Sequence, residues 1–402
     1  MANCLVAQSG GPTSAINASL AGVVRGAKNS KSFDKCLGAL HGVQGLINEE
    51  IKDLTDIDTK KLSLTPSMYL GSCRYKLPEY ADAPEEYEKI FDILKKNDVD
   101  TFFYIGGNDS MDTVSKLSAY ASAKDESIQF IGVPKTIDND LCVTDHTPGY
   151  GSAAKFIATT LLEVSHDTAI YPIKSVTIVE IMGRDAGWLA GAAALARNDY
   201  NVVPHLIYLP EVAFNEDEFI EDVKDMIEKH GNVVVAVSEG IKDKDGVYIT
   251  SSSATEDKFG HSQLSGTGKT LELLVKEKIG VKARAVEINI PQRTAGHMAS
   301  LTDIEESIAQ GEFAVEKAEE GMSGVMITIH RLSDIPYTTY LSTTDIDDTA
   351  GLIKHVPKKW INKRGNDVTD EFIQYVKPLI QGEVDLKYKD GLPDYMDISD
   401  LL

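Results

Sequence analysis

The chain has 402 residues, of which 42% are hydrophobic and 25% are charged, and this balance is typical of globular proteins and excludes a disordered chain. Its 40 basic and 62 acidic residues give a net charge of −22, so we expect neither a nucleic acid nor an anionic membrane surface as a partner. No apolar run reaches the roughly 18 residues of a membrane span, and the four cysteines are widely spaced. We therefore expect a cytoplasmic protein with reduced thiols, long enough for two domains.

Strand-like and helix-like patterns alternate along the chain, beginning with an apolar strand at residues 3–7. A helix with an apolar face is predicted after Gly10 and Gly11, and another opens at Pro84 and ends at Asn97. Further strands are predicted at residues 101–105, 128–133, 175–181, 206–209 and 232–237, and further helices at 151–164 and 369–379. This alternation predicts an α/β fold with parallel sheets that helices cover on both faces.

Two polar stretches follow apolar strands, namely residues 106–110 (Gly-Gly-Asn-Asp-Ser) and residues 134–140 (Pro-Lys-Thr-Ile-Asp-Asn-Asp). Each lies where a predicted parallel strand ends, and ligands usually bind at this carboxyl edge of an open α/β sheet. Glycine lets a backbone approach phosphate oxygens closely, and carboxylates take protons or help to hold Mg²⁺. The two stretches therefore predict a site for a metal-bound polyphosphate beside a hydroxyl acceptor, and the alternative is that both are ordinary turns.

Residues 265–270, Ser-Gly-Thr-Gly-Lys-Thr, look like a phosphate-binding P-loop but do not complete its pattern. The pattern requires a glycine five residues before Gly268, where this chain has Gln263. The segment also lacks a preceding apolar strand. We therefore predict that it does not hold a nucleotide.

Several motifs, in the same order along the chain, resemble the phosphofructokinase family and specifically its pyrophosphate-dependent branch. They are residues 9–11, 71–74, 106–110, 134–140, 182–184, Glu239 and 291–293. The resemblance implies two Rossmann-like three-layer domains with mostly parallel sheets, an active site in the cleft between them, and a homodimer or homotetramer. We expect a pyrophosphate domain at residues 1–148, completed by part of 292–340, a fructose 6-phosphate domain at 149–291, and a C-terminal extension that packs on the core at 341–402.

The same resemblance assigns roles to the residues of these motifs. It makes Asp138 the general base that takes the proton from the C1 hydroxyl of fructose 6-phosphate, since a carboxylate with a pKa of about 4 is ionised at neutral pH. Asp109 and Lys135 complete the expected catalytic group. The residues expected to bind pyrophosphate are Gly11, Arg74, Asp109 and Lys135. Those expected to bind fructose 6-phosphate are Thr136, Ile137, Asp138, Met182, Gly183, Arg184, Glu239, Arg284 and Arg293.

The choice of phosphoryl donor depends on two positions, since ATP-using relatives typically carry glycine where this chain has Asp109 and Lys135. A carboxylate at Asp109 would occupy the α-phosphate position of ATP and repel its charge, and the ammonium of Lys135 can stabilise the departing phosphate. We therefore expect pyrophosphate to be the donor. The alternatives are an ATP-dependent sugar kinase and a non-catalytic regulatory paralogue that binds sugar phosphates.

Three positions depart from the family pattern. Asn108 stands where many relatives use an aspartate for Mg²⁺, the expected cofactor, so the metal is expected to sit mainly on pyrophosphate, with the Asn108 carbonyl oxygen as a weaker ligand. Ile290 stands three residues before Arg293, where relatives often have His or Tyr, so one polar sugar contact is lost or moved. An intersubunit arginine expected before the strand at 175–181 is absent, and the neighbouring Lys174 is a candidate substitute.

Overall fold

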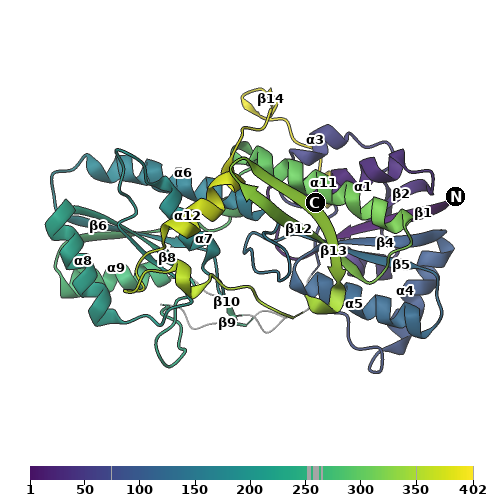
Figure 1. Cartoon of the computed structure of the whole chain (residues 1–402), viewed down its shortest axis with the longest axis horizontal. Coiled ribbons are helices and arrows are strands. Elements are labelled where there is room, and N and C mark those ends of the chain that lie inside the picture. Colours follow the sequence, from purple (N-terminus) through teal and green to yellow (C-terminus); the bar gives the residue numbers. More distant parts are fainter. Residues whose placement is uncertain (74, 251–254, 257–261, 264–265, 350, 402) are drawn as a thin grey trace.

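The computed structural model describes residues 1–402 apart from 74, 251–254, 257–261, 264–265, 350 and 402. Two large sheets lie in separate halves of the molecule (Figure 1). The sheet of the first half runs in the order β13 (Tyr337–Asp345), β12 (Val325–Asp334), β5 (Gln129–Pro134), β4 (Val99–Gly106), β1 (Ala2–Gln8), β2 (Phe33–Ala39) and β3 (Ile51–Asp53). The sheet of the second half runs in the order β11 (Lys282–Glu287), β6 (Ser175–Ile181), β8 (Asn232–Ser238) and β7 (Leu206–Tyr208).

Both sheets are mostly parallel, which confirms the predicted fold class. In the first half only the outermost strands, β3 and β13, pair antiparallel with their neighbours. In the second half every neighbouring pair is parallel. Parallel neighbours end at the same edge, so the loops after β1, β4 and β5 meet at one edge of the first sheet, and those after β6 and β8 meet at one edge of the second.

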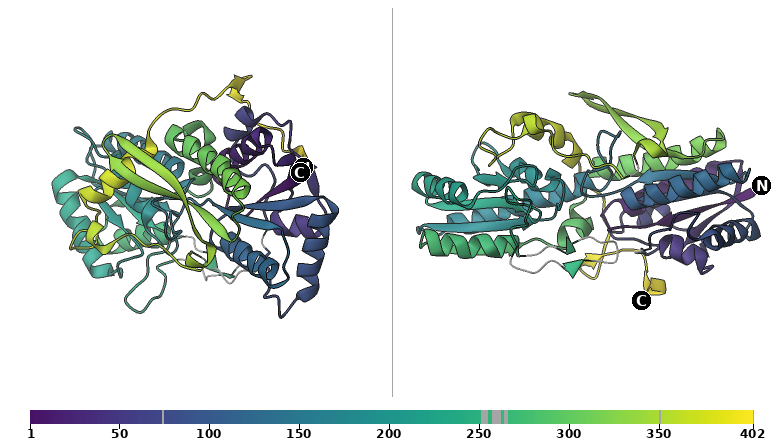
Figure 2. Two further views of the ribbon diagram at one scale, coloured as in Figure 1. Left: turned by 45° about the vertical axis from the view of Figure 1, so that its right-hand side comes forward. Right: turned by 90° about the horizontal axis from the view of Figure 1, so that it is seen from below.

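Helices cover both faces of each sheet, as the view from below shows (Figure 2, right). Successive side chains of β1 alternate between two cores, with Leu5 in one and Val6 in the other, and both are fully buried. This burial on both faces is why the strand is continuously apolar in sequence. In the first half the faces are covered by α1 (Ile16–Asn29) with α11 (Leu301–Glu319), and by α4 (Pro84–Lys96) with α5 (Asn108–Ala123). In the second half they are covered by α6 (Tyr150–Ala169), α7 (Trp188–Ala192) and α12 (Asp370–Val376), and by α8 (Glu216–His230) with α9 (Thr267–Lys278).

Helices α1 and α11 lie close together because each presents a glycine to the other. A Cβ atom on Gly22 would lie 2.1 Å from the carbonyl oxygen of Ile308, and one on Gly311 would lie 2.2 Å from that of Ser19. Only glycine permits this approach of the two backbones. The contact fastens α11, which follows the second sheet in sequence, to the first half of the molecule.

The C-terminal part of the chain contacts both halves. The β12–β13 hairpin extends the first sheet, so β13 runs across position 340, where the sequence predicts the C-terminal extension to begin. Helix α12 packs on the second half, where the ring of Phe372 stacks on that of Trp188 with centroids 5.9 Å apart. The last residues return to the first half, where Lys61 pairs with Asp394 at 2.7 Å.

The strands predicted from the apolar runs are all present, with small differences at their ends. The helix predicted at 369–379 is α12 followed by a 3₁₀ turn. Among the helices that the structure describes, none has the length and apolar character needed to cross a membrane. The other short elements are α2 (Gly42–Ile47), α3 (Thr59–Ser63), α10 (Pro291–Thr294), β9 (Thr255–Glu256), β10 (Ser262–Gln263), β14 (Tyr388–Lys389), β15 (Leu392–Pro393), η1 (Ala193–Ala196), η2 (Gly296–Met298), η3 (Ile346–Asp348), η4 (Lys358–Trp360), η5 (Lys377–Ile380) and η6 (Ser399–Leu401).

Candidate active site

Three loops meet at the carboxyl edge of the first sheet, because β1, β4 and β5 are neighbours there. The Oγ of Ser9, after β1, lies 2.5 Å from the Oγ of Ser110 at the start of α5. Lys135, after β5, donates its backbone N–H to the carbonyl oxygen of Gly106 at 2.9 Å. These contacts bring residues 9–11 and the two polar stretches predicted from the sequence into one place. We call residues 135–149, which connect β5 to α6, the Asp138 loop.

Lys135 lies beneath the loop that follows β1. Its side chain is 2% exposed, and its Nζ donates to the carbonyl oxygen of Gly11 at 2.7 Å. A Cβ atom on Gly10, whose φ is +81°, would lie 3.2 Å from this Nζ, so glycine leaves room for the ammonium. Burial lowers the pKa of Lys135 to about 8, although Asp138 and Asp140 act in the opposite sense. The side chain therefore remains mostly protonated at neutral pH and places a positive charge under the loop.

Asp138 and Asp140 form an interacting pair of carboxylates. Burial raises the pKa of Asp138, while the Thr136 hydroxyl, which donates to Oδ2 at 3.3 Å, and Arg184 act to lower it. Burial and the charge of Asp138 raise the pKa of Asp140 to about 7. The sequence-based expectation of an aspartate with a pKa of about 4 is therefore wrong here, because it assumed a solvated carboxyl group. A raised pKa makes Asp138 a stronger proton acceptor for a hydroxyl group.

The start of α5 offers an oxygen for a cation. The Nδ2 of Asn108 donates to Oδ2 of Asp140 at 3.3 Å, and its buried Oδ1 has no hydrogen-bond partner among the described residues. A carbonyl oxygen beside a carboxylate suits Mg²⁺, which prefers oxygen ligands. Within the described ranges, no group of three or more His, Cys, Asp or Glu side chains is placed to hold a metal. These residues therefore fit a Mg²⁺ ion that takes most of its ligands from phosphate oxygens and water.

Asp109 is exposed in the first turn of α5.

The second half contributes residues from the loops after β6 and β8. The backbone N–H of Gly183 donates to Oε1 of Glu239 at 3.4 Å. Burial raises the pKa of Glu239 to about 7, and the charge of Asp138 adds to this effect. Arg184, whose Nε donates to Asp185 at 3.0 Å, in turn lowers the pKa of Asp138. The charged groups of the two halves thus act on each other across one site.

Ile137 and Met182 belong to the apolar core of the second half. Ile137 is 6% exposed, and Met182 packs partly buried against the same cluster. The backbone N–H of Met182 donates to Oε1 of Gln292 at 3.2 Å. The side chain of Ile137 therefore fastens the Asp138 loop to the second half, which leaves only its backbone to contact a ligand.

Arg293 lies beside the loop after β1. A Cβ atom on Gly11 would lie 3.5 Å from its Nη1, and its charge acts on Lys135. The sequence predicts Arg293 as a ligand of the sugar 6-phosphate, and the structure places it next to a predicted pyrophosphate residue as well. Ile290 is 57% exposed. Arg74 lies outside the described residues.

Arg284 does not lie with the other predicted site residues of its own chain. Helix α6 begins beside Thr136, through a bridge between Thr136 and Gly149. Arg284 instead pairs at 3.5 Å with Asp167, near the other end of α6, and its side chain is 44% exposed. Lys174 is also exposed. Both cations are thus presented at the surface of the second half.

Sequence motifs gave no indication of the residues of the C-terminal extension that form hydrogen bonds to the Asp138 loop. Asn139 is fully buried, and its Nδ2 donates to Oη of Tyr375 at 3.0 Å. Its Oδ1 accepts from Nζ of Lys354 at 3.3 Å. Asn139 itself lies inside a motif, but Lys354 and Tyr375 come from the C-terminal extension, where neither spacing nor periodicity marks them.

The segment that looks like a P-loop is already occupied by a protein carboxylate. The backbone N–H of Gly268, at the start of α9, donates to Oε2 of Glu180 at 2.7 Å. This carboxylate takes the place that a phosphate would need at the helix N-terminus. The geometry of the described residues agrees with the prediction that the segment binds no nucleotide, and Ser265 lies outside them.

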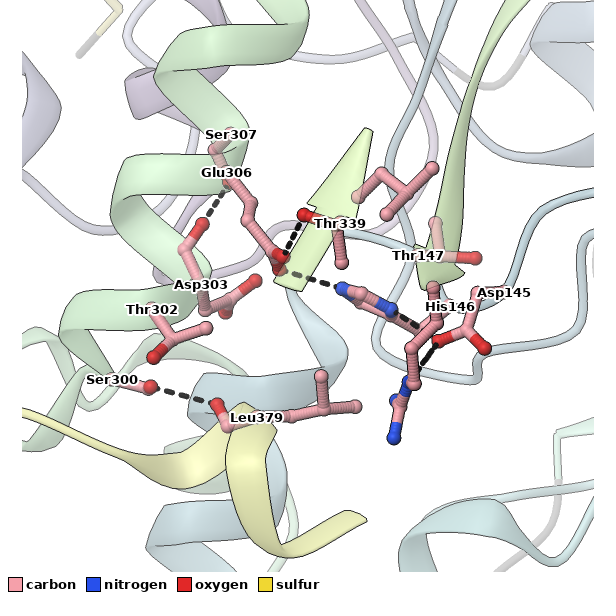
Figure 3. A network of polar contacts seen from close by, with 12 residues as sticks. Asp145, His146, Thr147, Ser300, Thr302, Asp303, Glu306, Ser307, Thr339 and Leu379 are labelled. Atoms are coloured by element: carbon pink, nitrogen blue, oxygen red, sulfur yellow. Dashed lines mark hydrogen bonds and ion pairs between the residues drawn. The ribbon is translucent and has the colours of Figure 1, made fainter. Parts of the chain in front are cut away.

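A buried histidine fastens the Asp138 loop to α11 (Figure 3). The Nδ1 of His146 lies 2.8 Å from Oδ2 of Asp145, and its Nε2 lies 2.7 Å from Oε2 of Glu306. Burial alone would lower the pKa of this ring, but the two carboxylates outweigh it and raise the pKa to about 9. The imidazole is therefore charged at neutral pH and bridges the two carboxylates.

We expect His146 to stabilise the fold fully below its unfolded pKa of about 6.5 and to lose this contribution as the pH rises through about 9. The folded pKa is raised, so the unfolded chain loses its proton first, and the contribution lost is about 3 kcal/mol. Urea unfolding of the natural chain and of His146→Gln checks this. The difference in free energy of unfolding between the natural chain and His146→Gln should be smaller at about pH 10 than at about pH 6 by that amount. The control is His297→Gln, at an exposed histidine, and a pH-independent difference for His146→Gln would contradict the expectation.

Comparison with known proteins places the chain in a family. The model of the family described as Phosphofructokinase matches residues 3–316. A pyrophosphate–fructose 6-phosphate 1-phosphotransferase from Xanthomonas campestris is 42% identical over 99% of this chain and 96% of its own length. One from Rhodospirillum rubrum is 42% identical over 94% of this chain and 93% of its own length. The crystal structure of a pyrophosphate-dependent phosphofructokinase from Nitrosospira multiformis has a TM-score of 0.88 and 38% identity, and covers 98% of this chain and 95% of that one.

Proposed function

Because the chain belongs to the phosphofructokinase family, we propose that it transfers a phosphoryl group from pyrophosphate to the C1 hydroxyl of fructose 6-phosphate. The products are fructose 1,6-bisphosphate and phosphate. The observation that carries this proposal is the similarity to pyrophosphate–fructose 6-phosphate 1-phosphotransferases over nearly the whole length of both chains. We expect the reaction to run in both directions, since the donor anhydride and the product ester are closer in energy than with ATP.

The proposed mechanism begins with proton removal by Asp138. Its carboxylate takes the proton of the C1 hydroxyl as the hydroxyl oxygen attacks the nearer phosphorus of pyrophosphate. The bond from that phosphorus to the bridging oxygen breaks, and phosphate leaves with the electron pair. Lys135, under the loop that contains Gly11, faces the negative charge that develops on the leaving phosphate. Asp109 excludes the larger nucleotide donor.

Groups from both halves hold the acceptor in this proposal. Arg184 can contact both the transferred group and Asp138, because its charge already acts on that carboxylate. Glu239 can accept hydrogen bonds from sugar hydroxyls, as can the backbone around Met182 and Gly183. Thr136 orients the base through its hydroxyl. Arg293 supplies positive charge for a phosphate group.

Mg²⁺ is the cofactor of this proposal. When bound, it neutralises charge on the pyrophosphate oxygens. The residues that would hold it are Asn108, through its unpaired Oδ1, and Asp140, whose carboxylate lies beside Asn108. The proposal retains the division into a pyrophosphate domain (1–148 with part of 292–340), a fructose 6-phosphate domain (149–291) and an extension (341–402).

The proposal also includes a homodimer or homotetramer in the cytoplasm. The exposed cations Arg284 and Lys174 support shared sites, because Arg284 pairs with Asp167 and with none of the predicted site residues of its own chain, and both cations are accessible to a second copy. All four cysteines are free thiols, which is compatible with a reducing compartment.

Assay of the purified chain with fructose 6-phosphate, Mg²⁺ and either pyrophosphate or ATP tests the function. We expect turnover with pyrophosphate and a kcat/KM for ATP lower by roughly a thousandfold. Turnover with ATP alone would identify an ATP-dependent sugar kinase instead. Binding of the sugar phosphate without turnover of either donor would identify a regulatory paralogue.

A further inference from the structure

The Asp138 loop is held in a strained backbone conformation. Asn139, between the two carboxylates, has a φ of +53°, and Val143 has a φ of +66°. Asparagine tolerates this left-handed region, but a β-branched residue adopts it only when the surroundings impose it. Val143 is 46% exposed, so its own packing does not supply that restraint. The restraint must come from groups that bind the loop backbone and Asn139.

Lys354 contributes to this restraint from the C-terminal extension. Its backbone N–H donates to the carbonyl oxygen of Asp140 at 2.7 Å. Its Nζ lies 3.3 Å from Oδ1 of Asn139, 3.2 Å from the carbonyl oxygen of Thr144 and 2.9 Å from that of Asp145. One ammonium therefore ties together both ends of the strained segment, through three oxygens that lie on either side of Val143.

The position of Lys354 is itself fixed by the second half. Its carbonyl oxygen accepts from Nε1 of Trp188 at 2.8 Å, and its Nζ lies 5.5 Å from the centre of that ring. Tyr375, also in the extension, donates its hydroxyl to the carbonyl oxygen of Asp145 at 2.6 Å and accepts from Asn139. Lys354 is therefore itself held in a fixed position while it binds the loop.

We propose that Lys354 is a positioning residue for the phosphoryl transfer: by binding Asn139 and the backbone on both sides of Val143, it fixes the direction of the Asp138 carboxylate. It contacts neither substrate and acts through the loop. This inference rests on the proposed function of Asp138 as the base. It makes the C-terminal extension a part of the active site.

The test compares Lys354→Met with the natural chain in the pyrophosphate assay. We expect kcat to fall by roughly 10- to 100-fold, because a base misplaced by about 1 Å loses that much. The KM values for pyrophosphate and fructose 6-phosphate should change by less than about threefold, since the substrate contacts remain. Lys354→Arg should recover part of the kcat, because a cation again faces the loop oxygens. Lys363→Met, at an exposed lysine of the same extension, is the matched control and should behave as the natural chain.

A kcat for Lys354→Met equal to that of the natural chain, or a loss confined to KM, overturns the inference. If this variant does not fold, Tyr375→Phe decides, because it deletes two hydrogen bonds to the loop and keeps the ring: a several-fold loss of kcat supports the inference, and an unchanged kcat overturns it. If the natural chain itself lacks activity, the proposed function fails separately. A crystal structure of Lys354→Met, or of Tyr375→Phe if the former does not fold, then decides the inference. Positioning by Lys354 requires that Asn139 loses its positive φ in the variant, and a retained positive φ overturns the inference.

Discussion

Replacing Asp138 by asparagine should lower kcat with pyrophosphate by roughly a thousandfold, the size of contribution that a positioned general base makes. The amide has the shape of the carboxylate but cannot take the proton of the C1 hydroxyl. Its Oδ1 can still accept from Thr136, so the loop keeps its local contacts. The KM for pyrophosphate should change little, because binding of the donor does not require the base. Steady-state kinetics in the forward direction measure both quantities.

The control for this substitution is Asp92→Asn, which removes the same charge from an exposed position on α4. Its kcat should equal that of the natural chain. Thermal unfolding should show that Asp138→Asn is at least as stable as the natural chain, since a buried carboxylate whose pKa is raised by burial is unfavourable in its charged form. An Asp138→Asn enzyme that keeps full kcat would contradict the role of Asp138 as the base.

The sequence predicts the location of the site well because the relevant information is local. Residues 106–110 and 134–140 each follow a strand that is buried on both faces and therefore visible as an apolar run. Once β4 and β5 are parallel neighbours, the two stretches must meet. The same reasoning brings residues 9–11 to the site through β1.

What the sequence does not predict depends on long-range packing. The β12–β13 hairpin closes one edge of the first sheet, and α11 reaches the same half through the Gly311 contact with α1, so neither position follows from periodicity. The raised pKa of Asp138 likewise depends on its burial in the folded chain. The contact of Lys354 with Asn139 joins segments that no motif connects.

Replacing both Asp109 and Lys135 by glycine should let ATP act as a donor. Asp109 is exposed in the first turn of α5, at the edge where the donor phosphates are expected, and its charge would lie a few ångströms from the α-phosphate of ATP. Two like charges about 4 Å apart repel by about 4 kcal/mol at an effective dielectric constant of about 20, which corresponds to roughly a thousandfold in affinity. Measured kcat/KM values should therefore rise for ATP by up to about that factor. They should fall for pyrophosphate, because the buried ammonium under Gly11 is lost.

The single variants separate the two effects. Asp109→Gly should admit ATP without a large loss of pyrophosphate turnover, because the repulsive charge is removed and Lys135 remains. Lys135→Gly should impair pyrophosphate turnover without admitting ATP. Asp112→Gly, one turn along the same helix, controls for the weakening of α5 by glycine and should keep the natural preference. If the double variant still discriminates against ATP as strongly as the natural chain, charge and volume at residue 109 do not set the donor. The preference must then come from the absence of a surface that binds adenosine.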